Sequence, residues 1–171
     1  QKFIGMLAFA VWDLKKRKLL LVRDRTGIKP LFYYKNSDTL LFGSELKALY
    51  AHPSYKKNFN KRGLGQFFTL GYTLDESTVF DNTFRLQAGH YMEIDNSGNS
   101  SIHCYWSLNN VKRGTFKGSF DDAVNEFEIL SKSAFSYRLV SDVPVGIFLS
   151  GGIDSTYLAA ILKKKMDLDL L

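Results

Sequence analysis

The chain changes its hydrophobic periodicity about two thirds of the way along its 171 residues. In the first part, apolar residues form short runs separated by polar turns; the runs at 6–12 and 19–22, for example, flank the lysine-rich sequence LKKRK. This pattern is typical of a hairpin of buried β-strands. Beyond residue 118 the apolar spacing becomes that of an amphipathic helix. The pattern therefore predicts two parts of different architecture.

Turn and capping signals divide the first part further. The sequences KNSD at 35–38 and DNSGNS at 95–100 are turn sequences between apolar runs. We expect Ser44 to cap a short helix that ends before His52 and Pro53. Besides the first hairpin, the predicted elements of this part are strands at 31–34, 39–42, 91–94 and 102–105 and helices at 45–49 and 61–68.

The second part begins after a polar segment with two glycines, NNVKRGTFKG at 109–118, which predicts a linker. Ser119 and Asp122 then have the spacing of a capping box, and we expect a helix of about 20 residues. A buried strand at 145–149, a glycine turn and a helix from about Asp154 to Lys165 should follow. The expected core-facing stripe of the first helix is Phe120, Ala123, Val124, Phe127, Leu130, Ala134 and Tyr137.

Composition narrows the class of protein. Hydrophobic residues make up 45% of the chain, which is ample for a globular core. The longest apolar runs fall far short of the roughly 20 residues of a membrane span, so we expect no membrane association. Cys104 is the single cysteine, which favours a cytoplasmic location, and we expect it to pack as a small core residue. The net charge of +6 is scattered over several clusters, which favours solvated charge over nucleic-acid binding.

The glycine turn FLSGGIDSTYL at 148–158 is the candidate functional site. Gly151 and Gly152 would let an anion approach the backbone at a helix N-terminus, where free N–H groups and the helix dipole favour negative charge. Ser150 and Ser155 add hydroxyl donors, and Asp154 is a carboxylate ligand suited to Mg²⁺. The alternative is a tight turn whose polar residues only cap the helix. Neither GxxxxGK[ST] nor GxGxxG occurs, so a P-loop ATPase and a dinucleotide fold are not supported.

A family resemblance makes this interpretation more specific. SGGIDS at 150–155 resembles the pyrophosphate loop of the ATP-pyrophosphatase, or PP-loop, enzymes, which adenylate a substrate and release pyrophosphate. RLVSDVPVGIFLSGGIDST at 138–156 resembles the start of the synthetase domain in the family of glutamine-hydrolysing asparagine synthetases. Three stretches resemble later strands of that family's class II glutamine amidotransferase domain: GMLAFAVWD, VRDRTGIKPLFYY and FGSELKAL. LQAGHYMEI resembles the segment that closes this domain, although Ala88 stands where the family usually has proline.

The resemblance implies a domain organisation and a fold class. It implies a partial glutamine amidotransferase domain at 1–108, a linker at 109–118 and the start of a PP-loop domain at 119–171. The fold class is then α+β followed by α/β: the C-terminal part of an N-terminal-nucleophile αββα sandwich, joined to the first helix-strand-loop-helix of a Rossmann-like ATP-pyrophosphatase. Arg23, Asp24 and Arg25 are open to a structural role or a ligand contact, and we assign them to the scaffold.

The resemblance also implies a reaction. ATP and Mg²⁺ would act on aspartate to give β-aspartyl-AMP, and ammonia from glutamine would then yield asparagine. By carry-over, Ser150, Gly151, Gly152 and Ser155 would bind ATP pyrophosphate, Asp154 would bind Mg²⁺, and the backbone of Phe148 would contact the nucleotide. The partners would be these small molecules, without nucleic acid or membrane, in a homodimer of the full-length protein.

No catalytic residue of the glutaminase site is expected in this chain. The family's nucleophile is an N-terminal cysteine whose free amine acts as its base, whereas residue 1 is Gln1 and the amine of Cys104 lies within a peptide bond. We therefore expect an internal piece of a longer enzyme that is inactive alone. Two alternatives stay open: a related amidotransferase that acts on another carboxylate, of a sugar or a β-amino acid, and a non-catalytic module with a degenerate site.

Overall fold

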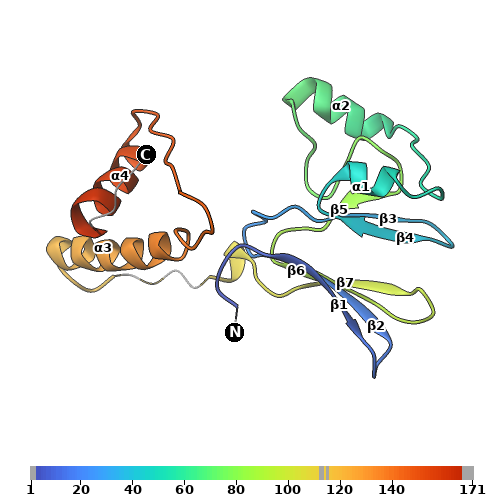
Figure 1. Ribbon diagram of the computed structural model, residues 1–171, viewed down its shortest axis with the longest axis horizontal. Coiled ribbons are helices and arrows are strands. Elements are labelled where there is room, and N and C mark those ends of the chain that lie inside the picture. The colour runs from blue at the N-terminus through green and yellow to red at the C-terminus, as the bar shows by residue number, and fades with distance from the viewer. Residues whose placement is uncertain (1–2, 112–113, 115, 167–171) are drawn as a thin grey trace. The chain divides into compact units, whose positions relative to one another are not determined.

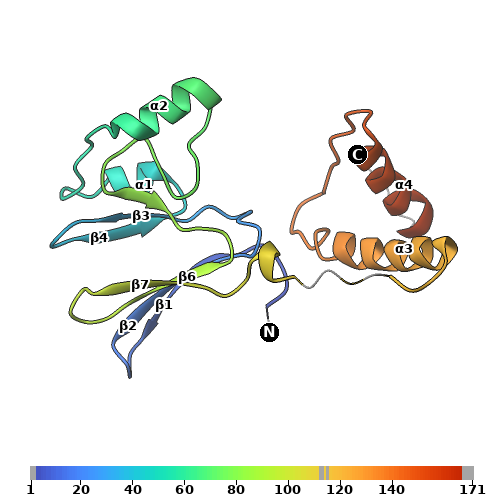
Figure 2. The same cartoon turned by 180° about the vertical axis from the view of Figure 1, so that it is seen from behind.

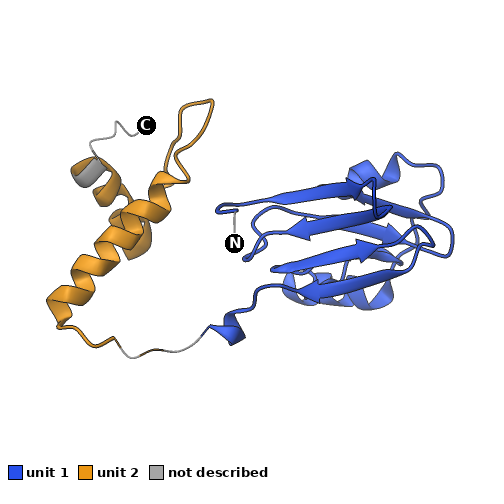
Figure 3. Ribbon diagram, turned by 90° about the horizontal axis from the view of Figure 1, so that it is seen from below, with its two compact units in different colours: residues 1–111 blue, residues 112–171 orange. Residues whose placement is uncertain are grey.

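The chain divides into two compact units, which Figure 3 distinguishes by colour. The computed structural model describes residues 3–111, 114 and 116–166. Unit 1 is Gln1–Val111 and unit 2 is Lys112–Leu171. The division falls inside the predicted linker at 109–118, of which residues 112–113 and 115 lie outside the described residues. No helix among the described residues is long and apolar enough to cross a membrane.

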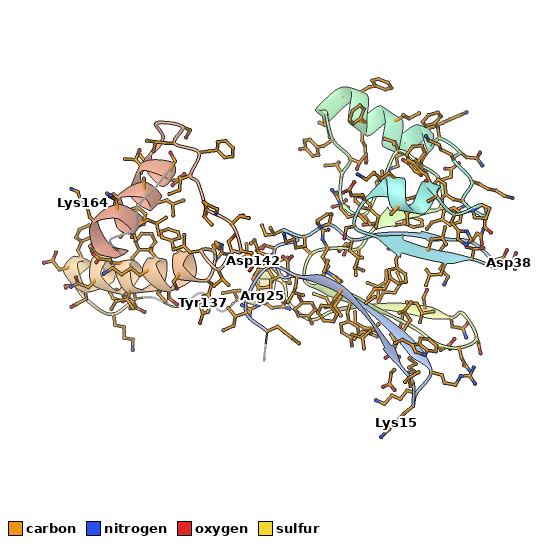
Figure 4. All side chains as sticks on the ribbon, viewed as in Figure 1. Lys15, Arg25, Asp38, Tyr137, Asp142 and Lys164 are labelled. Carbon is orange, nitrogen blue, oxygen red and sulfur yellow. The ribbon has the colours of Figure 1, made fainter. Side chains whose placement is uncertain are left out.

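Unit 1 is built from two antiparallel sheets, two α-helices and one short 3-10 helix, η1 Leu108–Asn110 (Figure 1). One sheet has the strand order β1-β2-β6-β7 and the other has the order β4-β3-β5. The strands are β1 Ala8–Asp13, β2 Lys18–Arg23, β3 Phe32–Lys35, β4 Leu40–Gly43, β5 Thr83–Arg85, β6 His90–Ile94 and β7 Ser100–Cys104. The predicted hairpins β1-β2, β3-β4 and β6-β7 are confirmed. Figure 4 labels Lys15 and Asp38, which lie at the tips of the first two hairpins.

Alternation along β3 directs two adjacent tyrosines into two different cores. Tyr33 joins the core between the sheets, where Leu21 of β2 lies opposite Met92 of β6. Tyr34 is 1% exposed and points to the other side, where its ring lies 4.9 Å from that of Tyr55. The core between the sheets consists of Leu21, Leu31, Tyr33, Leu86, Met92 and Ile94.

The second core of unit 1 lies beneath its helices, α1 Leu46–Tyr50 and α2 Lys61–Leu70. Figures 1 and 2 show both helices on the side of the β4-β3-β5 sheet that faces away from the other sheet. Leu49 of α1 is 1% exposed, and the ring of Tyr50 packs edge-on against that of Phe80 at 5.5 Å. Unit 1 therefore has the layer order sheet, sheet, helices, and its α+β class with antiparallel sheets agrees with the expectation.

The helix starts differ from the prediction in one case. Glu45, not Ser44, is the N-cap of α1, and it makes no side-chain capping hydrogen bond. The burial of Leu49 against the sheet, rather than a local cap, thus stabilises this short helix. α2 is capped by Asn60, whose Oδ1 accepts a hydrogen bond from Gly63 N at 2.8 Å, and it ends at Gly71 with φ of 80°. Asn60 was missed, although it is a standard capping residue just before the helix.

Cys104 does not pack in the core, so that prediction was wrong. It is exposed at the end of β7, where it donates a hydrogen bond to the Trp106 carbonyl at 3.2 Å. All five residues of β7 are exposed because the strand lies at an edge of its sheet. The apolar neighbour Tyr105 suggested that Cys104 is buried. An edge strand does not provide that burial.

Unit 2 contains the helices α3 Phe120–Ser136 and α4 Ile153–Met166. The predicted capping box is present, because Ser119 and Asp122 each accept a backbone hydrogen bond from the other. The expected core-facing stripe of α3 was wrong: Phe120 is 82% exposed, and Val124, Phe127, Leu130 and Tyr137 are also exposed. Among the described residues of unit 2, only α4 packs against α3 with several contacts, so most of the stripe has no cover.

The predicted buried strand at 145–149 was also wrong. The structure assigns no strand there, and the Phe148 and Leu149 side chains are exposed. A strand is stable only when its N–H and C=O groups pair with a neighbour, and the described part of unit 2 contains no other strand. The apolar run therefore remains irregular, and the expected helix-strand-loop-helix of unit 2 is a helix-loop-helix in the described residues.

Candidate functional site

The candidate site is the turn that leads into α4. Its first residues, 150–152, lie outside the helix, and 153–155 form the first helical turn. Gly151 has a φ of +80°, which lies in the left-handed region that glycine adopts without strain. A Cβ added there would meet no atom within 4 Å. The glycine is thus explained by the backbone conformation, and the space around it is open.

Two serine hydroxyls meet over this turn. The Oγ atoms of Ser150 and Ser155 are 3.1 Å apart, and Ser155 Oγ also donates to the Gly152 carbonyl at 3.1 Å. The Gly152 carbonyl accepts the first helical hydrogen bond, from Thr156 N at 3.1 Å. The N–H groups before Thr156 project from the end of the helix, as the first N–H groups of any helix do. Hydroxyl and N–H donors are therefore gathered at one exposed helix terminus.

Asp154 lies within this turn, directly before Ser155, and Phe148 lies two residues before Ser150. The Asp154 carboxylate is exposed in the first turn of α4. No group of three or more histidine, cysteine, aspartate or glutamate side chains in the described part of the chain could hold a metal ion. One carboxylate still suits a Mg²⁺ that takes its other ligands from phosphates and water. The Phe148 side chain is fully exposed.

Together these groups have the donor chemistry of an anion-binding site. The structure brings Ser150, Gly151, Gly152 and Ser155 together as the sequence predicted. An anion at a helix N-terminus is stabilised by the N–H groups and by the dipole. The same serine contacts also satisfy the alternative of a purely structural turn, because they help to cap α4.

Tyr157 was missed by the sequence analysis and attaches the site to α3. Its ring stacks on Phe127 at 5.4 Å and packs against Phe135 at 6.3 Å. Phe127 and Tyr157 are therefore partners across the α3-α4 contact. The sequence shows them only as apolar residues of two separate helices, so it did not predict this pairing. Tyr157 lies two residues beyond Ser155, so this aromatic contact fixes the helix that carries the serine hydroxyl.

Arg23 and Asp24 act as scaffold, as assigned, whereas the same assignment for the exposed Arg25 stays a prediction. Arg23 donates hydrogen bonds to the carbonyls of Lys29, Leu86 and Gly27 at 2.9, 2.6 and 2.6 Å. Asp24 is 3% exposed, and its carboxylate accepts from the backbone N–H groups of Leu7, Thr26, Ile28 and Lys29. Both side chains are buried and bond to the backbone of unit 1, which distinguishes them from the exposed turn at 150–155.

Comparison with known protein families gives two matches, which follow one another along the chain as the two units do. Residues 1–106 match the family described as glutamine amidotransferase domain. Residues 126–170 match the family described as asparagine synthase, and this match includes the turn at 150–155.

Comparison with curated proteins gives matches along almost the whole chain. Asparagine synthetase [glutamine-hydrolyzing] 3 of Bacillus subtilis is 41% identical over 158 residues, covering 92% of this chain and 25% of that protein. Asparagine synthetase [glutamine-hydrolyzing] 2 of the same organism is 40% identical, covering 96% and 23%. A putative asparagine synthetase [glutamine-hydrolyzing] 2 of Methanocaldococcus jannaschii is 34% identical, covering 100% and 33%. The chain thus spans a quarter to a third of the length of these relatives.

Proposed function

Because this chain belongs to the glutamine amidotransferase domain family, we propose that it is part of a glutamine-hydrolysing asparagine synthetase. In the proposed reaction, glutamine supplies ammonia, and ATP converts the aspartate β-carboxylate to β-aspartyl-AMP with release of pyrophosphate. Ammonia then displaces AMP to give asparagine. The observation that carries the proposal is the SGGIDS turn at the start of α4, inside the asparagine synthase match and after the amidotransferase match.

Each group at the turn has a role in this proposal. Ser150, Gly151, Gly152 and Ser155 bind the pyrophosphate part of ATP through hydroxyl and backbone N–H donors. The backbone of Phe148 contacts the nucleotide. Asp154 contributes a carboxylate oxygen to Mg²⁺, which when bound neutralises part of the phosphate charge. The side chains of this chain bind and orient ATP; they do not themselves break a bond.

The proposal also covers the domain organisation, the assembly and the location of the full-length enzyme. Residues 1–108 would be part of an αββα glutaminase sandwich, 109–118 its linker, and 119–171 the start of a Rossmann-like PP-loop domain. The enzyme would be a cytoplasmic homodimer that binds neither nucleic acid nor membranes. The exposed Val11 and Trp12 of β1 fit this fold, because a completed sandwich would cover more of that sheet.

The proposal is tested by pyrophosphate release from the full-length gene product. We predict that pyrophosphate release depends on ATP and aspartate. Asp154→Ala should lower the rate of release by about 100-fold, since loss of a group around a metal commonly lowers activity by a factor of this order. Asp121→Ala is a matched control, because Asp121 is an exposed aspartate in the first turn of α3. Undiminished release by the Asp154 variant would refute the Mg²⁺ role, whereas no aspartate-dependent release by the wild type would refute the proposed function.

A second candidate is a related amidotransferase that acts on another carboxylate, of a sugar or a β-amino acid. Amidase chry2 of Gibberella zeae, a relative not named as an asparagine synthetase, is 30% identical over 159 residues, so similarity alone does not select aspartate as the acceptor. Pyrophosphate release with such an acceptor, and not with aspartate, would select this candidate. The absence of pyrophosphate release with either kind of acceptor would select a non-catalytic module.

A further inference from the structure

The turn at 150–155 is held in the described part of unit 2 through the helix that follows it. The segment 140–149 before the turn forms no helix or strand, so no regular element holds the turn from that side. On the other side the turn continues directly into α4, which packs against α3. The position of the turn therefore depends on how α4 is docked on α3.

The buried face of α4 begins at Tyr157. Ile153, four residues earlier, is 88% exposed, whereas Ile161, four residues later, is 5% exposed. Residues four apart lie on the same face of a helix, so these three side chains form one row along α4. Tyr157 is also the one aromatic residue in the sequence of α4. It is therefore the large side chain of this row that lies nearest to the turn.

Two rings of α3 hold the Tyr157 ring between them. Phe127 stacks on it at a centroid distance of 5.4 Å, and Phe135 packs against it at 6.3 Å. Phe127 and Phe135 lie eight residues apart on one face of α3, and the small, buried Ser131 stands midway between them. A ring that is contacted from both sides cannot shift along α3 in either direction without losing one of these contacts.

The ring of Tyr157, rather than its hydroxyl, makes this contact. The hydroxyl oxygen is buried and has no hydrogen-bond partner among the described residues. A buried hydroxyl without a partner is unfavourable, whereas aromatic rings at these distances attract one another. Phenylalanine at position 157 should therefore hold α4 on α3 at least as well as tyrosine.

Ser155 connects the docking of α4 with the chemistry of the turn. It lies two residues before Tyr157, and its Oγ lies 3.1 Å from both Ser150 Oγ and the Gly152 carbonyl oxygen. A shift of the first turn of α4 would therefore move this hydroxyl together with the N–H groups of the helix terminus. Groups that bind a ligand have to be held within about 0.5 Å of the productive geometry, so such a shift would weaken anion binding.

We propose that Tyr157 is a positioning residue for the pyrophosphate part of ATP: its ring, held by Phe127 and Phe135, fixes the helix terminus that binds the phosphates. The inference rests on the proposed function, because it places ATP at the turn. ATP bound there favours the docked position of α4 in return. Loss of the ring should therefore raise the KM for ATP and leave kcat at saturating ATP unchanged.

The test measures the Kd for ATP with Mg²⁺ by isothermal titration calorimetry of the full-length gene product. We expect Tyr157→Leu to raise this Kd about tenfold, since the loss of a stacked aromatic pair has an effect of this order. Tyr157→Phe keeps the ring and should stay within about twofold of the wild type. Phe127→Leu should weaken ATP binding too, and the double variant should bind no more weakly than Tyr157→Leu, because both changes disrupt one contact.

Phe120→Leu is the matched control, because Phe120 is also a phenylalanine of α3 but is 82% exposed. Circular dichroism checks that each variant folds, and if Tyr157→Leu does not fold, Phe127→Leu decides in its place. Unchanged ATP affinity in the folded variant, or an equal loss in Tyr157→Phe, would overturn the inference while the proposed function stands. A wild-type protein that binds no ATP would overturn the inference and the proposed function together.

Discussion

At the scale of single residues, Asp24 shows how a buried charge can organise a loop. Its two carboxylate oxygens accept hydrogen bonds from the N–H groups of Leu7, Thr26, Ile28 and Lys29, and its carbonyl accepts from Gly27 and Gly89. Burial would raise the pKa of Asp24, but the backbone hydrogen bonds outweigh it and hold the pKa below its ordinary value. The folded state is therefore stabilised by the ionised form of this group.

We predict that Asp24→Asn lowers the free energy of unfolding of unit 1 at pH 7 by about 1–3 kcal/mol. In the variant, the asparagine Nδ2 would face two backbone N–H groups that bond to a carboxylate oxygen of Asp24 in the wild type. Because the folded pKa is depressed, the stabilisation by Asp24 is complete above the unfolded pKa of about 3.9 and is lost as pH falls through the folded pKa. The difference between wild type and variant should therefore shrink below about pH 4.

Urea unfolding followed by tryptophan fluorescence measures this difference in unit 1, since both tryptophans, Trp12 and Trp106, lie there. Asp38→Asn is the control, because Asp38 is exposed at the tip of the β3-β4 hairpin, and it should change stability by less than about 0.5 kcal/mol. An Asp24→Asn effect of equal size at pH 7 and pH 3 would contradict the explanation through the carboxylate charge.

Residue types with a local function were predictable, and those whose function depends on tertiary neighbours were not. The serines and glycines of the turn at 150–155 lie together because they are close in sequence, so their clustering followed from the motif. The rings of Tyr33 and Phe84 lie 5.3 Å apart only because β5 pairs with β3, and β5 itself was not predicted. Its three residues are too short a segment for a periodic signal.

At the scale of elements, α2 contains two glycines that have different environments. Gly63 is buried, and a Cβ added to it would overlap the backbone carbonyl of Thr78. A Cβ added to Gly65 would meet no atom within 4 Å. Glycine costs a helix about 1 kcal/mol relative to alanine, so its presence at Gly63 is explained by close packing and its presence at Gly65 is not.

We predict opposite effects from the same substitution at these two positions. Gly63→Ala should destabilise unit 1 by about 3 kcal/mol, because α2 must move away from the segment that carries Thr78. Gly65→Ala should stabilise it by up to about 1 kcal/mol, because alanine is the better helix former. Thermal unfolding followed by circular dichroism at 222 nm, a helix signal, measures both. If the two variants unfold at the same temperature, the packing explanation for Gly63 is wrong.

The elements that the sequence predicted are those with local signals. Three hairpins follow from alternating runs and turn sequences, and the start of α3 follows from the Ser119 capping box. The predicted strand at 145–149 failed because an apolar run becomes a strand only beside a partner strand, which its own sequence does not specify. The Ser44 cap failed because packing of Leu49, rather than capping, determines where α1 lies.

At the scale of the whole molecule, the two units differ in how much of their apolar surface they bury. Unit 1 has a continuous core between its sheets and a second one beneath its helices. The fully buried residues in the described part of unit 2 are Ser131, Ile161 and Leu162. Since burial of apolar surface is the main stabilising term, unit 2 is held mainly by the contact of α3 with α4.

Hydrogen exchange measured by mass spectrometry on the 171-residue chain should separate the two units. We predict that amides of α3 and α4 exchange at least about 100-fold faster than those of β2 and β6, equivalent to ~3 kcal/mol in the free energy of opening.

Phe127→Ala should speed exchange in α4 further, because it removes the ring that stacks on Tyr157, and should leave β2 unchanged. Phe120→Ala is its control, because Phe120 is 82% exposed on the same helix. Protection of α4 equal to that of β2 would contradict the prediction, because it would require more stabilisation of the α3-α4 contact than the burial of Ile161 and Leu162 provides.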